Sequence, residues 1–345
     1  MKNKNIFKIN AIYFTAISLV AVVFLFGYMG WLKNDILTSF LIQIVVMFAI
    51  PILMYALLFK KSLKKTCNDI GLRKISSKMV GISIVLGIVL YFINSFVADA
   101  FASIIALFGY ESISSSTTTS FNYGILIKEF ILSCVLPGFC EEVLHRGIML
   151  HANKKFANTK FCLIISSILF GLTHLNIRQF FYAAILGFLM GYVSLVANSI
   201  IPSIIIHFMN NFLSTYFYYG THLNWPLAKF INFVTNIFLN DVFIFISTST
   251  VSVALLLLAY QYLTKQLQKE RAKFETQKTL TLLKKEQISV EDAQNKLSEI
   301  NTLLKDKHIK ETKKPKPTFL QLTFLISSIV LGGFLTISSF IWGVI

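Results

Sequence analysis

Long apolar stretches, separated by short polar segments, recur along the whole 345-residue chain. A helix of ~20 apolar residues is long enough to cross the hydrocarbon core of a bilayer. The pattern predicts an all-α, polytopic transmembrane helical bundle of eight or nine spans. The candidate spans are 10–32, 36–59, 79–108, 123–150, 161–176, 179–197, 199–219, 241–263 and 319–344.

Lys and Arg between these stretches predict the orientation of the bundle. They concentrate in the N-terminus and in segments 60–78, 151–160 and 264–318. The cytoplasmic loops of membrane proteins carry such an excess. With nine spans every basic segment falls on one side, so we expect a cytoplasmic N-terminus. The first apolar stretch is too long for a cleaved signal peptide and is expected to be a retained helix.

Composition supports the membrane class and limits the partners. Hydrophobic residues make up 55% of the chain and charged residues 14%, with 33 Phe against 6 Pro. The net charge of +16 is what basic loops require, and no nucleic-acid-binding module is visible, so no nucleic-acid partner is predicted. The richness in Lys, Ile, Asn and Phe is typical of an AT-rich genome. It therefore favours a bacterial plasma membrane as the location of this multi-pass chain.

The chain divides into five predicted parts. Segment 264–318 is the one long polar stretch, with a helical run over 266–285 and a capping-box start at Ser289 and Asp292. It is expected to form a solvated helical hairpin, or to dock a cytosolic partner or the leaflet surface. The parts are 1–121 (first three spans), 122–219 (catalytic core), 220–263 (an interfacial helix at 225–240 and a span), 264–318 (charged cytoplasmic segment) and 319–345 (last span).

Charged side chains interrupt the fourth span. Ionisable residues are costly inside a bilayer, so they indicate a functional site. Glu142 and Arg146 are four residues apart and share a helix face, which predicts a salt bridge. Glu141 points about 100° away and is left free. Pro137 and Gly138 are expected to open the helix beside it and expose a wet cavity.

Two histidines and an asparagine complete the candidate site. His207 and Asn211 fall at i and i+4, a spacing that presents two donors to a developing oxyanion. Asn210 is expected to point elsewhere. His174 lies at the end of the fifth span. The presence of His207 and Asn211 makes it a candidate for the same site. His145 shares a face with Glu141 and is expected to line the cytoplasmic rim.

Other chemistries remain open on the residues alone. Glu141, His174 and His207 are legitimate zinc ligands, although the HExxH helix of zinc proteases is absent. No serine or cysteine motif supplies a nucleophile. A transporter is disfavoured because no pair of broken spans is related by inverted symmetry.

The three motifs together resemble a known family. The sequences EEVLHRG (141–147), FGLTHL (170–175) and HFMNN (207–211), in this order on separate apolar helices, resemble the CPBP family of CAAX proteases and bacteriocin-processing proteins, also called Abi. The resemblance implies a metal-independent, cofactor-free glutamic intramembrane protease. It implies that Glu141 with His174 activates a water and that His207 and Asn211 form the oxyanion site. Glu142 and Arg146 match the supporting positions, whereas His145 stands where the family usually has an apolar residue.

The predicted function is hydrolysis of a membrane-embedded or lipid-anchored peptide or protein, in a cavity reached from the membrane or the cytoplasm. CAAX-type cleavage, leader- or signal-peptide processing and bacteriocin immunity are all compatible with the resemblance. The competing interpretation is a non-proteolytic membrane regulator or scaffold of the same family, and the third is a zinc-dependent membrane hydrolase.

Overall fold

The computed structural model describes residues 3–32, 34–111, 123–230, 242–305, 314 and 317–344. Every element in these ranges is helical, which confirms the all-α prediction. By length and composition, six helices are able to cross a membrane: Lys4–Gly27, Ile36–Phe59, Ser77–Ala106, Tyr123–Lys155, Ile177–Ala197 and Phe319–Ile341. The count of eight or nine spans, the cytoplasmic N-terminus and the five-part division stay predictions.

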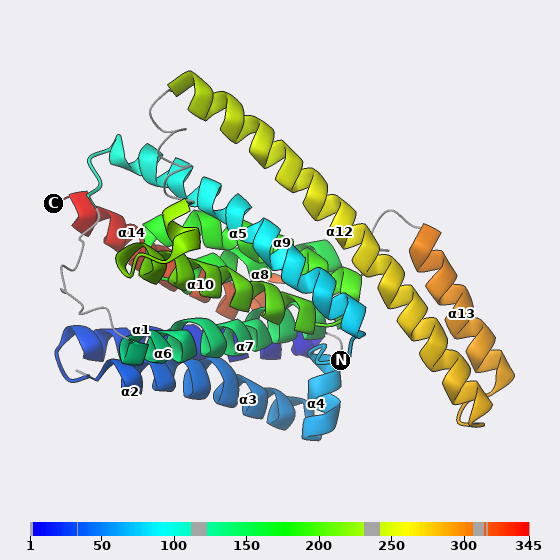
Figure 1. Ribbon diagram of the computed structural model, residues 1–345. Helices are drawn as coiled ribbons and strands as arrows, with labels where there is room; N and C mark the ends of the chain where they lie inside the picture. Colours follow the sequence, from blue (N-terminus) through cyan, green and yellow to red (C-terminus); the bar gives the residue numbers. More distant parts are fainter. Residues whose placement is uncertain are drawn as a thin grey trace.

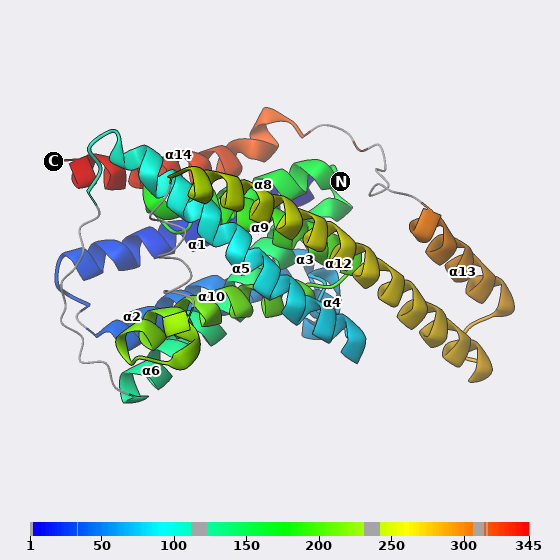
Figure 2. The ribbon, with the colours of Figure 1, turned by 45° about the horizontal axis from the view of Figure 1, so that its top comes forward.

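The first and last helices lie side by side, as Figures 1 and 2 show. Helix α1 (Asn3–Tyr28) packs along α14 (Phe319–Val344). The Asn10 side chain donates to the carbonyl of Gln321 at 2.9 Å, and the rings of Phe7 and Phe324 are 4.9 Å apart. The next span, built of α2 (Asp35–Phe40), η1 (Leu41–Ala49) and α3 (Ile50–Phe59), packs beside α1.

The segment that carries Glu141 and Glu142 is helical from Tyr123 to Lys155. It consists of α6 (Tyr123–Glu129), η2 (Phe130–Val135), α7 (Leu136–Glu142), η3 (Val143–Ala152) and η4 (Asn153–Lys155), of which η2 and η3 are π-helical. Pro137 and Gly138 do not open it, because a proline is tolerated in the first turn of a helix. A Cβ on Gly138 would lie 3.2 Å from the Cα of Phe208, so this glycine permits close packing on α10 (Ile201–His222).

Helices α8 (Thr159–Leu172) and α9 (Ile177–Ala197) pack closely. A Cβ on Gly187 would lie 3.1 Å from Cδ1 of Phe170, and one on Gly191 would lie 2.6 Å from Cδ1 of Leu163. Small residues on a helix face allow such a close approach of a neighbouring helix. Helix α5 (Ser77–Ala106) packs against both α9 and α10.

A helical hairpin extends beyond the bundle (Figures 1 and 2). The predicted last-but-one span and the helical run after it form one helix, α12 (Val242–Lys284), followed by α13 (Val290–Lys305). The capping box is confirmed, because Oγ of Ser289 accepts from the backbone N–H of Asp292 at 3.0 Å. Of the predicted interfacial helix, residues 226–230 are helical and 231–240 lie outside the described residues.

The basic segments meet at one end of the bundle. Lys61 and Lys155 both pair with Asp69, near α4 (Leu63–Asp69). Burial alone would raise the pKa of Asp69, but the hydrogen bonds from Lys155 and Lys61 outweigh it and lower the pKa below its ordinary 3.8. Arg73 donates to the Asn198 carbonyl at 2.9 Å.

Candidate active site

The predicted salt bridge between Glu142 and Arg146 is confirmed. Nη1 of Arg146 lies 2.6 Å from Oε1 of Glu142, and neither side chain is exposed. Arg146 also donates from Nη2 to the carbonyl of Gly187 at 3.2 Å. Because its buried charge is balanced by Glu142, the arginine is tolerated in the apolar bundle.

The ring of Phe170 joins the three sequence motifs. The Arg146 guanidinium carbon lies 4.2 Å from the ring centroid, a cation–π distance. His174 and His207 approach the same ring edge-on, with centroids 5.2 and 5.4 Å away. The motifs on η3, α8 and α10 therefore converge, as expected from their chemistry.

His207 contacts Glu142. Its Nδ1 lies 3.1 Å from Oε1 of that carboxylate. A carboxylate only accepts, so Nδ1 carries the hydrogen. When the ring is protonated, Nε2 carries a second hydrogen, which is available to a group in the adjoining cavity.

His174 is held by a backbone carbonyl. Its Nδ1 lies 2.9 Å from the carbonyl oxygen of Phe170, so Nδ1 donates and Nε2 of the neutral ring is an acceptor. Helix α8 has 14 residues and is about 21 Å long at 1.5 Å per residue, shorter than the ~30 Å core of a bilayer. His174 follows this short helix and lies in the wall of the main cavity.

Glu141 lies apart from the Phe170 cluster. Its Oε1 accepts from Nε2 of Gln43 at 2.8 Å, and its side chain is partly buried and not in the wall of the main cavity. The structure gives Glu141 no hydrogen bond to His174 among the described residues. Sequence reasoning missed Gln43, although an amide inside the strongly apolar stretch 36–59 is a detectable signal.

His145 is not at the cytoplasmic rim. It is fully buried, its Nδ1 lies 2.8 Å from the backbone carbonyl of Glu141, and its ring lies edge-on to Tyr13 and Phe170. The rim prediction is wrong because apolar helices α1 and α8 cover this face of η3. Because His145 contacts the backbone carbonyl of Glu141, it stabilises the helix and does not hold the Glu141 carboxylate.

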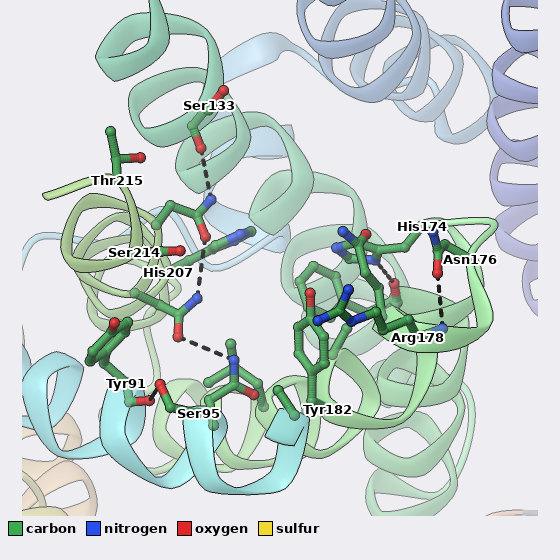
Figure 3. Close-up of a pocket in the computed structure, with 18 of the residues that line it drawn as sticks. Tyr91, Ser95, Ser133, His174, Asn176, Arg178, Tyr182, His207, Ser214 and Thr215 are labelled. Atoms are coloured by element: carbon green, nitrogen blue, oxygen red, sulfur yellow. Dashed lines mark hydrogen bonds between the residues drawn. The ribbon is translucent and has the colours of Figure 1, made fainter. Parts of the chain in front are cut away.

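A cavity of about 940 Å³ opens beside the two catalytic candidates His174 and His207. In Figure 3 these two histidines lie on opposite sides of the hollow. Asn211 donates to the Ser133 carbonyl at 2.9 Å. Asn210 does not point elsewhere but lines the same cavity and donates to Oδ1 of Asn211 at 3.3 Å. Most residues of the wall carry a hydroxyl or an amide group. Both groups form hydrogen bonds readily with a polypeptide.

The zinc alternative finds no ligand set in the part of the chain that the structure describes. Within these residues, no three His, Cys, Asp or Glu side chains gather closely enough to hold a metal ion. Glu141, His174 and His207 belong to the three motifs but do not form such a group.

Comparison with known proteins supports the same core. Residues 124–213 match the family model described as type II CAAX prenyl endopeptidase Rce1-like. No curated protein and no solved structure matches the chain. The match covers η2, α7, η3, α8, α9 and most of α10, and with them all three motifs. Residues 124–213 are thus similar to Rce1-like CAAX endopeptidases, in agreement with the resemblance to the CPBP family, and six of the described helices are long and apolar enough to make a multi-pass membrane protein.

Proposed function

We propose that this protein is an intramembrane endopeptidase that cleaves a membrane-associated peptide or protein with an activated water. The observation that carries the proposal is the placement of His174 and His207 on opposite sides of one cavity and against one ring (Figure 3). In this proposal Nε2 of His174 accepts from the water, and Nε2 of His207 donates to the oxyanion when that ring is protonated; amide hydrolysis requires both functions.

Glu141 is the better candidate for the base. The charge of Glu142 is already committed to Arg146 and to His207. Glu141 has no ion pair among the described residues, and its carboxylate accepts from the neutral amide of Gln43. In this proposal the Glu141 side chain leaves Gln43 on the arrival of substrate and turns to a water held by Nε2 of His174. Apo enzymes often show such loose catalytic geometry.

The proposed step balances as follows. The water oxygen bonds to the carbonyl carbon, and its proton passes to Glu141 with the help of His174. The carbonyl oxygen becomes an oxyanion that accepts hydrogen bonds from protonated His207 and from the Asn211 amide. The carbon–nitrogen bond then breaks, and the amine leaves with the proton that Glu141 returns.

The test is cleavage of a pool of internally quenched peptides by the full-length protein in liposomes. Glu141→Gln keeps the shape and removes the base, so turnover should fall by at least ~100-fold. Glu129→Gln is the matched control, since Glu129 lies on the same helical segment, where its carboxylate accepts from the hydroxyl of Ser133. Undiminished cleavage by folded Glu141→Gln protein would end the assignment.

The zinc-dependent reading is tested on the same preparation. We expect no stoichiometric zinc in the purified active protein and no loss of cleavage after treatment with chelators. Stoichiometric zinc whose removal stops cleavage, and whose return restores it, would replace the glutamate mechanism with a metal one.

A scaffold role has its own supporting observation, the α12–α13 hairpin outside the bundle (Figure 1). It is fastened to the core by Tyr260, which donates to the Leu189 carbonyl at 3.1 Å, and by Arg271, which donates to the Val196 carbonyl at 2.7 Å. In a complementation assay a scaffold would survive replacement of Glu141 and His174 but fail without the hairpin. We expect the replacement of Glu141 and His174 to abolish function.

A further inference from the structure

The cavity approaches one end of the bundle. Three residues of its wall mark that end: Tyr110 follows the last turn of α5, Asn176 lies between α8 and α9, and Ser339 lies near the end of α14. Each of α5, α8 and α14 begins at the opposite end, beside a Lys- or Arg-rich segment. None of the described residues that line the cavity comes from 60–78, 151–160 or 264–318.

The opposite side of the cavity is closed. Phe170 and His207, which belong to its wall, are 1% and 3% exposed. Behind them lie Arg146 over the Phe170 ring and Glu142 on the His207 imidazole, both fully buried. A polypeptide approaching from the basic end would therefore have to break a buried ion pair, at a cost of several kcal/mol.

The chemistry of the wall fits a polypeptide. Side-chain amides and hydroxyls line it, among them Asn94, Asn210, Tyr91 and Tyr182, whereas its described residues include no Asp or Glu. An extended segment that leaves water needs replacement partners for its backbone N–H and carbonyl groups. This wall offers them.

Because the Lys- and Arg-rich end of a membrane protein faces the cytoplasm, the cavity opens toward the other side. We propose that the substrate is an outward-facing or exported polypeptide segment, which enters the cavity from the face of the membrane opposite the basic loops. The access route stands on the geometry alone, while the cleavage of that segment rests on the proposed function.

Cysteine labelling tests the route without any hydrolysis. In a Cys67→Ser background, Gln179→Cys and Ser214→Cys place thiols in the cavity wall. Lys64→Cys places one at the exposed basic end. The other native cysteines, Cys134, Cys140 and Cys162, are buried. A membrane-impermeant sulfonated maleimide is applied to spheroplasts that express the full chain, before and after permeabilisation.

We expect both cavity thiols to react in intact spheroplasts and the Lys64→Cys thiol to react only after permeabilisation. The reverse pattern, or a Ser214→Cys thiol reached only from inside, would overturn the inference. Ser95→Cys, also in the wall, replaces either variant that does not fold. Outward labelling of a protein that cleaves no peptide would refute the proposed function alone, and inward labelling of an active protein would refute the access route alone.

Discussion

Nδ1 of His207 lies 3.1 Å from Oε1 of Glu142, the same oxygen to which Arg146 donates at 2.6 Å. One carboxylate oxygen thus connects the second glutamate of the EEVLHRG motif with the histidine of the HFMNN motif. In the proposed mechanism the second glutamate therefore holds the oxyanion histidine in place, and the first is left to meet the water.

This relationship predicts that Glu142 and His207 act as one unit. Loss of an oxyanion donor through His207→Ala should lower kcat by ~100-fold or more. Glu142→Gln should lower it too, since it removes the charge that balances protonated His207. Measured as kcat in a double-mutant cycle, the double variant should be no worse than His207→Ala. Additive losses would show that the two residues act separately.

Arg146 should matter more for folding than Glu141 does. Removing one partner of a buried ion pair leaves an uncompensated charge and costs ~3–5 kcal/mol. Arg146→Ala should therefore reduce the yield of folded protein and its melting temperature in detergent far more than Glu141→Gln. Arg146→Lys should rescue little, because a lysine does not reproduce the planar guanidinium over Phe170. Equal melting temperatures for Arg146→Ala and Glu141→Gln would contradict this division.

Gly187 should tolerate no side chain. A Cβ there would lie 3.1 Å from Phe170, 3.3 Å from Nη2 of Arg146 and 3.3 Å from the Cα of Ser167. Gly187→Ala should cost ~1–3 kcal/mol of stability through overpacking. Gly81→Ala is the control, since a Cβ on Gly81 meets nothing within 4 Å. Thermal unfolding of both variants measures the difference, and equal stability would refute the packing argument.

Acid should weaken the basic end through Asp69. Its folded pKa is lower than the ordinary 3.8, so its ion pairs add stability that is complete above that value and is lost as the pH falls through the lowered pKa. The melting temperature of the wild type should exceed that of Asp69→Asn at neutral pH, and the gap should close in strong acid. A gap that is constant with pH would exclude this linkage.

Arg178 should favour acidic peptides. It is the one Lys or Arg in the described wall of the cavity, and its guanidinium has no hydrogen-bond or ion-pair partner among the described residues. An exposed ion pair is worth ~0.2–1 kcal/mol, or up to about fivefold in kcat/KM. Two quenched peptides that differ by Asp against Asn should show this preference at low salt. Arg178→Gln should lose it, whereas Arg178→Lys should retain it; a preference unchanged in Arg178→Gln would rule out this contact.

Local spacing predicted some of the site and could not predict the rest. The Glu142–Arg146 pair and the Ser289 cap depend on contacts within one turn, so the sequence specifies them directly. The partners of Glu141 and His207 depend on how separate helices pack. Gln43 is 98 residues from Glu141, and Glu142 is 65 residues from His207, so no periodicity connects them. His145 was misplaced for the same reason, since α1 and α8 bury it.

The depth of His174 shows the same limit. The sequence places it at the end of the fifth apolar stretch, but its contact with Phe170 and its place beside the cavity depend on how α8 packs on its neighbours. The boundary between 161–176 and 179–197 was close to correct, yet the vertical placement of the turn depends on where α8 starts relative to its neighbours.

The contribution of α14 to the cavity wall has a consequence for biosynthesis. Ser339 belongs to the cavity wall and donates from its hydroxyl to the Thr336 carbonyl while accepting from the backbone N–H of Ile177, at the start of α9. Residues 319–344 leave the ribosome after the EEVLHRG, FGLTHL and HFMNN segments. A nascent chain that still lacks them therefore holds every proposed reacting group but an incomplete chamber, and the wall closes only after α14 has been inserted.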